Sequence, residues 1–171
     1  MTVSEQELQA LAQRVIRVCT ERGIYLAIAE SLTGGLVSSA LTSVPGASKV
    51  LLHSVVAYHN AAKHQLLNVR TVTLASFGAV SAQTARAMAE GVRVALSPVP
   101  TIDDSKIIGL STTGVAGPDT QEGKPVGTVF VGLAMAQKST DAGFALAGSR
   151  AQIRIAAAAE ALHFLLEQIA A

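Results

Sequence analysis

The sequence has little of what marks disulfide-bonded, secreted or membrane proteins. It contains one cysteine, no tryptophan and only 4% aromatic residues. A single cysteine cannot form an internal disulfide, and Cys19 lies on the apolar face of a predicted helix, which favours a core position. No apolar run approaches the roughly 20 residues needed to cross a bilayer. Residues 1–9 also lack the hydrophobic segment of a signal peptide. We therefore expect a soluble cytoplasmic protein with no membrane partner.

Charge is also scarce. Charged residues make up 15% of the chain and the net charge is +1. Neither half carries a basic run, which argues against a dedicated nucleic-acid-binding surface. A surface with few charges favours association with further copies of the chain, so we expect a homodimer or a larger homo-oligomer.

What the chain has in quantity is apolar residues, at 50% of 171. This size and composition are typical of one globular domain, expected here to span residues 1–171 and to bury roughly 70% of its unfolded surface. Residues 4–7 form a capping box, which predicts a helix to about Arg22 that ends at Gly23. Further helices are expected at 36–41, at 61–67 after an Asn60 cap, after Ser81, and at 150–170. Strands are expected at 25–29, 50–58, 106–112, 126–136 and 142–147.

Strands that alternate with helices and end in a hairpin predict an α/β fold: a single three-layer α/β/α domain with a mixed sheet. In open α/β sheets, ligands bind where strand ends meet helix starts. Segments that combine polar residues with such positions are expected at one crevice; they span 30–35, 58–63, 111–118 and 148–154.

The first of these segments is the most informative. An apolar strand leads into Ser31, and the pair Gly34-Gly35 opens a helix. This geometry exposes a hydroxyl together with the backbone N–H groups of a first helical turn. Ser31 is therefore either a nucleophile or a helix cap that binds an anion, and the residues by themselves favour the cap.

Standard catalytic motifs are absent from the sequence, which has no G-x-S-x-G, no G-x-G-x-x-G and no histidine pair at helical metal-binding spacing. Residues 117–124 are similar to a phosphate-binding loop, but the spacing is one residue too long and Pro125 replaces the required Ser or Thr. A serine nucleophile needs a base. His59 is the only histidine predicted in a loop and has no acid nearby in sequence, whereas Lys63 is a base if burial lowers its pKa.

Five motifs in order resemble the CinA C-terminal domain family over nearly the whole chain. They are Ala29-Glu30-Ser31-x-Thr33-Gly34-Gly35, Val56-Ala57-Tyr58-x-Asn60-x-x-Lys63, Gly78-Ala79-Val80-Ser81, Thr113-Gly114-x-Ala116-Gly117-Pro118 and Lys124-Pro125-Val126-Gly127-Thr128-Val129. The characterised members are nicotinamide-nucleotide amidohydrolases. The resemblance implies that nicotinamide mononucleotide is hydrolysed to nicotinic acid mononucleotide and ammonia, with no metal and no cofactor.

Roles follow from this resemblance by matching position. Ser31 would be the nucleophile, Lys63 the general base, and Tyr58 a residue that orients Lys63 or the serine proton. Backbone amides of the turn at 33–35 would bind the oxyanion. The implied substrate-binding residues are Glu30, Thr33, Gly34, Gly35, Thr112, Thr113, Gly114, Ala116, Gly117 and Arg150. Arg150 and Arg154 would reach the phosphate or a neighbouring subunit.

The chain departs from the family pattern at Leu32, where many members have cysteine directly after the serine. The alternative function is therefore a catalytically inactive module of the same family that binds a nucleotide and regulates a partner. A role in DNA uptake, which the family name suggests, is poorly supported by a nearly neutral chain.

Overall fold

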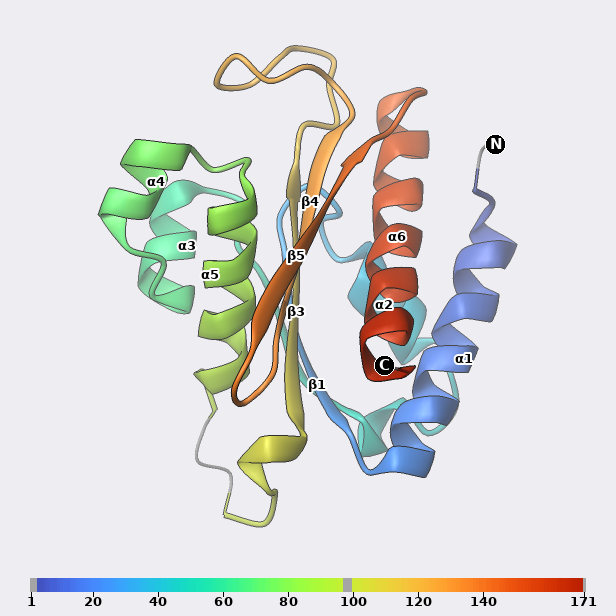
Figure 1. The fold of residues 1–171 in the computed structure, drawn as a ribbon. Coiled ribbons are helices and arrows are strands. Elements are labelled where there is room, and N and C mark those ends of the chain that lie inside the picture. The colour runs from blue at the N-terminus through green and yellow to red at the C-terminus, as the bar shows by residue number, and fades with distance from the viewer. Residues whose placement is uncertain (1–2, 97–99, 171) are drawn as a thin grey trace.

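The computed structural model describes residues 3–96 and 100–170. Within them, five strands form one mixed sheet in the order β2-β1-β3-β4-β5 (Figure 1). The strands are β1 (Tyr25–Glu30), β2 (Leu51–Val56), β3 (Ile107–Gly114), β4 (Thr128–Ala134) and β5 (Ser139–Ala145). Strands β2, β1 and β3 are parallel, whereas β4 and β5 form the predicted hairpin and run antiparallel to β3.

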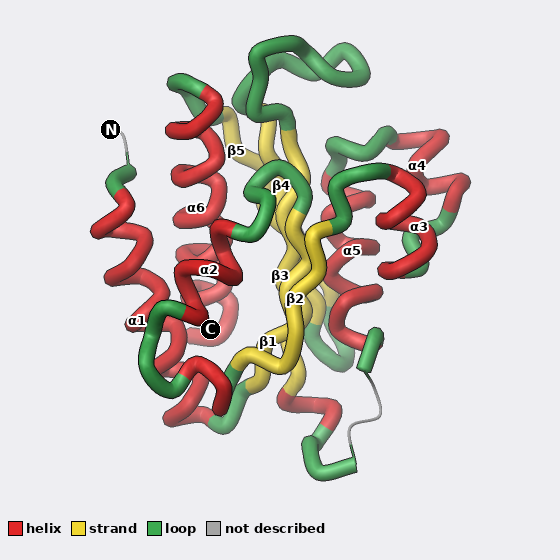
Figure 2. Tube along the Cα trace, turned by 180° about the vertical axis from the view of Figure 1, so that it is seen from behind, coloured by secondary structure: helices red, strands yellow, loops and turns green. Residues whose placement is uncertain are grey.

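Helices cover both faces of the sheet. One face carries α1 (Glu5–Arg22), α2 (Leu36–Thr42) and α6 (Arg150–Ala170), and the other carries α3 (Asn60–Leu67), α4 (Thr71–Phe77) and α5 (Ala82–Val94) (Figures 1 and 2). Short 3₁₀ turns at Ala47–Lys49 and Asp104–Lys106 precede β2 and β3. The predicted three-layer α/β/α architecture is therefore confirmed. No helix of the described residues is long and apolar enough to span a membrane.

Local sequence signals explain most of the helix ends. The capping box at Ser4 starts α1, and Gly23 ends it with a left-handed φ of 62°. The predicted Asn60 cap is wrong, because α3 begins at Asn60 and the Nδ1 atom of His59 accepts the Ala61 amide at 3.1 Å. Helix α4 was not predicted; it is seven residues long and none of them is fully buried, so its apolar periodicity is weak. The two prolines of residues 97–104 predict a loop there, and residues 97–99 lie outside the described residues.

The two faces of the sheet differ in side-chain size. Along β1 the large residues Leu26 and Ile28 belong to the core under α1, α2 and α6. The alternate residues Ala27 and Ala29 face α5. Because successive side chains of a strand point to opposite faces, a period of two separates a thick apolar layer from a thin one.

The thin layer allows α5 to approach the sheet backbone closely. A Cβ atom on Gly109 of β3 would lie 2.0 Å from the carbonyl oxygen of Ala89, and one on Gly132 of β4 would lie 2.2 Å from that of Ala85. The Ser111 hydroxyl on β3 donates to the same Ala85 carbonyl at 2.6 Å. Backbone atoms of the helix therefore occupy the space that side chains would otherwise fill.

This packing predicts a position-dependent effect of adding one methyl group to the sheet. Gly132→Ala should lower the free energy of unfolding by about 1–3 kcal/mol, because the helix backbone must move away from β4. Gly143→Ala on β5 is the matched control, since its added Cβ would meet only the movable ring of Phe130, at 3.1 Å. Urea unfolding of both variants measures the difference. Equal losses would contradict the close-approach explanation.

Candidate active site

The carboxyl ends of the three parallel strands meet at one edge of the sheet. Strand β1 ends at Glu30, whose carbonyl accepts the Ala57 amide at 2.8 Å after β2, and the Ser31 amide donates to Thr112 of β3 at 3.0 Å. From β1 the chain crosses one face of the sheet through α2, and from β2 it crosses the other face through α3, α4 and α5. Such a change of direction creates a crevice at the strand ends, where ligands of α/β proteins bind.

Ser31 and Lys63 are in direct contact in this crevice. The Nζ atom of Lys63 lies 3.0 Å from the Ser31 hydroxyl oxygen. It also donates to the carbonyl oxygen of Ala57 at 2.9 Å and to that of Tyr58 at 3.4 Å. Lys63 projects from α3, so two residues 32 positions apart meet because the β1 turn and α3 lie at the same strand ends.

The amino group of Lys63 is kept out of water. The residue is 1% exposed, which is unusual for lysine. Burial lowers the pKa of Lys63 to about 8, and the negative charge of Glu122 acts in the opposite direction. None of the ion pairs among residues 3–96 and 100–170 involves Lys63. Roughly a tenth of the amine is therefore uncharged at pH 7, and this fraction rises steeply towards pH 8; the uncharged form is the one that a general base requires.

A small pocket of about 100 Å³ opens onto this pair. Ser31 is 8% exposed and forms part of its wall. The other lining residues come from the end of β3 with the following loop, from the α4–α5 connection, and from the start of α6; they include Thr113, Gly114, Ala116, Gly117, Ala79, Val80 and Arg150. Five of the ten residues expected to bind substrate, those of the β3 end with its loop and Arg150, are therefore brought together around Ser31.

Glu30 is an exception, because it is fully buried and does not line the pocket. Its carboxylate accepts the amides of Gly35 at 2.9 Å, Val37 at 3.2 Å and Ser38 at 2.8 Å, and the Ser38 hydroxyl at 2.5 Å. The carboxylate thus accepts hydrogen bonds from amides at the start of α2 that have no acceptor within the helix. Its negative charge also interacts favourably with the positive end of the helix dipole. The expectation that Glu30 contacts substrate is corrected: it caps the helix.

The turn at 33–35 also differs from expectation. The Gly34 amide donates to the Ser31 carbonyl at 3.0 Å, and the Gly35 amide is held by Glu30, so neither points to a bound oxyanion. Thr33 and Thr112 are buried and share a hydrogen bond of 2.7 Å between their hydroxyls. Thr33, Gly34 and Gly35 form the turn and Thr112 contacts it, but none of these four residues lines the pocket. Among the described residues, the amides of Leu32 and Thr33 donate to no protein acceptor.

The side chain of Leu32 packs inward. It is 3% exposed and belongs to an apolar cluster with Val129 of β4 and with Ile153 and Ala157 of α6. A Cβ atom on Gly114 would lie 2.9 Å from a methyl carbon of Leu32. The residue after the serine is therefore a packing residue here, although part of it reaches the pocket wall.

Tyr58 and Arg150 meet at the rim of the pocket. The Tyr58 hydroxyl accepts a hydrogen bond from Arg150 at 2.7 Å, and the same guanidinium donates to the Gly117 carbonyl. Tyr58 is 58% exposed, and only its backbone carbonyl contacts Lys63. The structure thus places the phenol at the entrance. Arg154 lies elsewhere and donates to the carbonyls of Leu32 at 3.0 Å and Thr33 at 2.8 Å.

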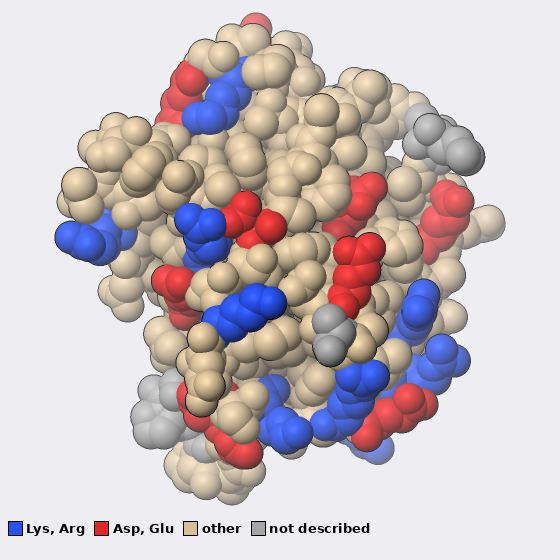
Figure 3. Space-filling model, viewed as in Figure 1, with Lys and Arg blue, Asp and Glu red and all other residues tan. Residues whose placement is uncertain are grey.

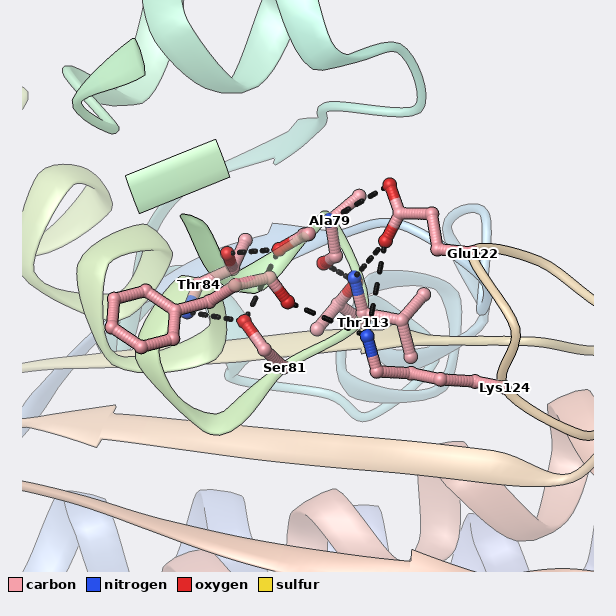
Figure 4. A network of polar contacts seen from close by, with 9 residues as sticks. Ala79, Ser81, Thr84, Thr113, Glu122 and Lys124 are labelled. Carbon is pink, nitrogen blue, oxygen red and sulfur yellow. Dashed lines mark hydrogen bonds and ion pairs between the residues drawn. The ribbon is translucent and has the colours of Figure 1, made fainter. Parts of the chain in front are cut away.

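Glu122 supports the pocket wall, a role that the sequence did not predict. It stands at the tip of the β3–β4 loop, and its carboxylate accepts the amides of Ala79 at 3.1 Å and Val80 at 3.5 Å (Figure 4). Thr113 donates to the Ala79 carbonyl at 2.7 Å, so two contacts join opposite walls of the pocket. Glu122 and Gly123 have φ values of 51° and 73°, typical of a tight hairpin turn. In the sequence, the pair Glu122-Gly123 before Lys124-Pro125 is the indication of this turn.

No histidine lines the pocket. His59 caps α3, and the ring of His64 contacts the Val69 carbonyl at 2.9 Å. Within residues 3–96 and 100–170, no group of three His, Cys, Asp or Glu side chains is placed to hold a metal ion. On the face drawn in Figure 3, basic and acidic side chains are interspersed, with no continuous field of one sign.

The chain matches the model of the CinA C-terminal domain over residues 8–169. A competence-damage inducible protein of Desulforamulus reducens is 44% identical over 161 residues, which cover 92% of this chain and 37% of the relative. A CinA-like protein of Syntrophotalea carbinolica is 43% identical over 158 residues, covering 92% of this chain and 36% of the relative. The chain therefore spans little more than a third of the length of these relatives.

Solved structures show the same fold. The competence/damage inducible protein CihA of Agrobacterium tumefaciens is 35% identical, with a TM-score of 0.85 and 98% of both chains covered. The competence damage-inducible protein A of Klebsiella pneumoniae is 30% identical, with a TM-score of 0.86; the match covers 95% of this chain and 97% of that one.

The burial of Lys63 predicts that stability depends on pH. Below pH 8 both folded and unfolded chains carry the proton, and the buried charge costs stability in full; between about 8 and 10.5 only the unfolded chain stays protonated, so stability rises with pH. At pH 7, Lys63→Met should be more stable than the wild type by about 1–3 kcal/mol, and the gap should close towards pH 10.

Urea unfolding across this pH range measures the gap. Lys49→Met, at an exposed lysine, is the matched control and should show no such pH dependence. A Lys63→Met variant less stable than the wild type at pH 7 would contradict the cost assigned to the buried amine.

Proposed function

Because the chain belongs to the CinA family through its C-terminal domain, we propose that it is an amidohydrolase that converts nicotinamide mononucleotide to nicotinic acid mononucleotide and ammonia. The proposal assigns Ser31 as nucleophile and Lys63 as general base. It concerns this domain, and no activity of the remaining length of the longer relatives is transferred. A cytoplasmic location and a homodimer or larger homo-oligomer stay predictions.

The contact between Ser31 and Lys63 is the observation that carries the proposal. An uncharged amine has two N–H donors and one lone pair. The carbonyls of Ala57 and Tyr58 take the two donors, at 2.9 and 3.4 Å, so the lone pair is left for the Ser31 proton at 3.0 Å. A helix cap needs none of this, which favours a nucleophile over the cap that the residues alone suggested.

The first half of the proposed reaction forms an acyl-enzyme. Lys63 takes the proton of Ser31 as the hydroxyl oxygen attacks the carboxamide carbon. The carbonyl oxygen becomes an oxyanion, for which we assign as donor the unpartnered amide of Leu32, the residue of the pocket wall that follows the nucleophile. The C–N bond then breaks, and the leaving nitrogen takes the proton from Lys63 and departs as ammonia.

The second half repeats these steps with water. Lys63, again neutral, takes a proton from a water molecule that attacks the acyl carbon. The C–O bond to Ser31 breaks, the serine oxygen recovers the proton, and the pyridine carboxylate leaves. The same base thus serves both steps, so atoms and protons balance.

The pocket size supports a substrate of which only one end is buried. Pockets that enclose whole drug-sized ligands measure roughly 300–1,000 Å³, whereas this one measures about 100 Å³. We infer that it takes the carboxamide-bearing ring, with the ribose phosphate directed to the rim, where Arg150 supplies a cation.

The Ser31 assignment predicts complete loss of activity on removal of one oxygen. Purified wild-type protein should release ammonia from nicotinamide mononucleotide, and Ser31→Ala should not, because no nucleophile remains. Ser39→Ala is the matched control, since Ser39 is exposed on α2 and away from the pocket. Intact ammonia release by Ser31→Ala would refute the proposed mechanism.

Leu32 separates the amidohydrolase from the alternative, an inactive nucleotide-binding module. Because its side chain packs against Val129, Ile153 and Ala157, Leu32→Cys should leave kcat/KM for nicotinamide mononucleotide nearly unchanged. The variant should cost about 1–3 kcal/mol of stability through the smaller side chain. An inactive wild type that gains ammonia release as Leu32→Cys, together with saturable nucleotide binding by calorimetry, would favour the inactive module.

A further inference from the structure

Arg154 contacts the turn that carries the nucleophile from the side away from the pocket. Its Nε atom donates to the Leu32 carbonyl at 3.0 Å, and its Nη2 atom donates to the Thr33 carbonyl at 2.8 Å. Arg154 does not line the pocket around Ser31; it lines a separate groove between α1, α2 and α6. The turn therefore lies between the guanidinium and the reacting groups.

These two hydrogen bonds fix the direction of two peptide units. In a trans peptide the N–H group points opposite to the carbonyl of the same unit. The Thr33 carbonyl points to Arg154, and the amide of the same unit, that of Gly34, donates in the other direction to the Ser31 carbonyl at 3.0 Å. By the same geometry the Ser31 carbonyl, which accepts the Gly34 amide, directs the Leu32 amide the opposite way, and that amide has no protein acceptor.

The guanidinium also polarises these peptide units. Arg154 takes part in none of the ion pairs found between residues 3–96 and 100–170, so its charge acts on the two carbonyls. A positive charge at a carbonyl oxygen strengthens the N–H donor of the same peptide unit. The effect passes from the Thr33 carbonyl to the Gly34 amide, and from there to the Ser31 carbonyl, so the Leu32 amide is both oriented and made a stronger donor.

The surroundings show that this contact is built into the turn. Gly34 has a φ of 59°, and a Cβ atom there would lie 3.0 Å from Nη2 of Arg154, so a glycine leaves room for the guanidinium. The neighbouring residue Ile153 packs against Leu32. Helix α6 thus holds the turn through the apolar contact of Ile153 and through the two hydrogen bonds of Arg154.

From these contacts we propose that Arg154 is a positioning residue that aims the amide of Leu32, a residue of the pocket wall, at the oxyanion formed during attack by Ser31. The inference rests on the proposed amidohydrolase function. Arg154 touches no reacting atom and acts through the Thr33 carbonyl, the Gly34 amide and the Ser31 carbonyl. Its contribution is confined to the transition state, because the amide carbonyl of the bound substrate carries little charge.

Kinetics of Arg154→Met and Arg154→Lys with nicotinamide mononucleotide test this role. Removal of one oxyanion donor costs roughly 10²–10³-fold in kcat; since Arg154→Met misaligns a donor without removing it, we expect about a 10–100-fold lower kcat at nearly unchanged KM. Arg154→Lys keeps the positive charge but lacks the planar guanidinium that donates to both carbonyls, so its kcat should lie between those of the wild type and Arg154→Met. Added guanidinium ion should partly restore Arg154→Met, and Arg14→Met, an exposed arginine on α1, is the control.

Amide hydrogen exchange at Thr33 and Gly34 provides a readout that does not depend on activity. In Arg154→Met the Gly34 amide should exchange faster, since its hydrogen bond to Ser31 loses support, while amides of β3 keep their rates. A wild type without ammonia release would refute the proposed function and leave this measurement to decide the contact itself. Unchanged kcat, or unchanged exchange at Gly34, would overturn the positioning role, and Arg154→Lys serves if Arg154→Met does not fold.

Discussion

The desolvated amine of Lys63 is the constraint on which the candidate site depends. A charged ammonium in this position is unfavourable, so burial lowers its pKa to about 8. Its partners within 3.4 Å are uncharged, two backbone carbonyls and one hydroxyl, and no ion pair of the described residues involves it. The end of β2, the start of α3 and the turn after β1 must all be in place to supply them. The proposed base at the wall of the pocket is thus obtained at the expense of stability at neutral pH.

The turn after β1 is fixed from two directions. From one side, the Glu30 carboxylate accepts three amides at the start of α2. From the other side, Arg154 of α6 donates to two carbonyls. Opposite charges therefore bind the opposite polar ends of the same short backbone segment. Between them the Leu32 amide remains without a protein acceptor at the wall of the pocket, as the proposed stabilisation of an oxyanion requires.

The sequence predicted the fold well because its signals are local. The capping box at Ser4, the apolar strand that leads to Ser31 and the late hairpin all depend on residues near one another in the chain. Helix α4 gave only a weak signal, since it is short and none of its residues is fully buried. For the site, the sequence indicated most of the pocket wall, but it could not show that Glu30 points under α2 or that the Tyr58 hydroxyl reaches Arg150. Those directions depend on tertiary packing, as does the contact of Glu122 with Ala79, 43 positions away.

The close approach of α5 to the sheet has a mechanical consequence for the pocket. The carbonyls of Ala85 and Ala89, one helical turn apart, fit against Gly132 and Gly109 on neighbouring strands. A helix held at two such points cannot slide along its axis or roll without collision between backbones. The connection that includes Ala79 and Val80 leads directly into this helix, so one wall of the pocket is attached to an element that close backbone contacts hold in place. Movement of the pocket wall is therefore expected in its other segments, such as the loop between β3 and β4.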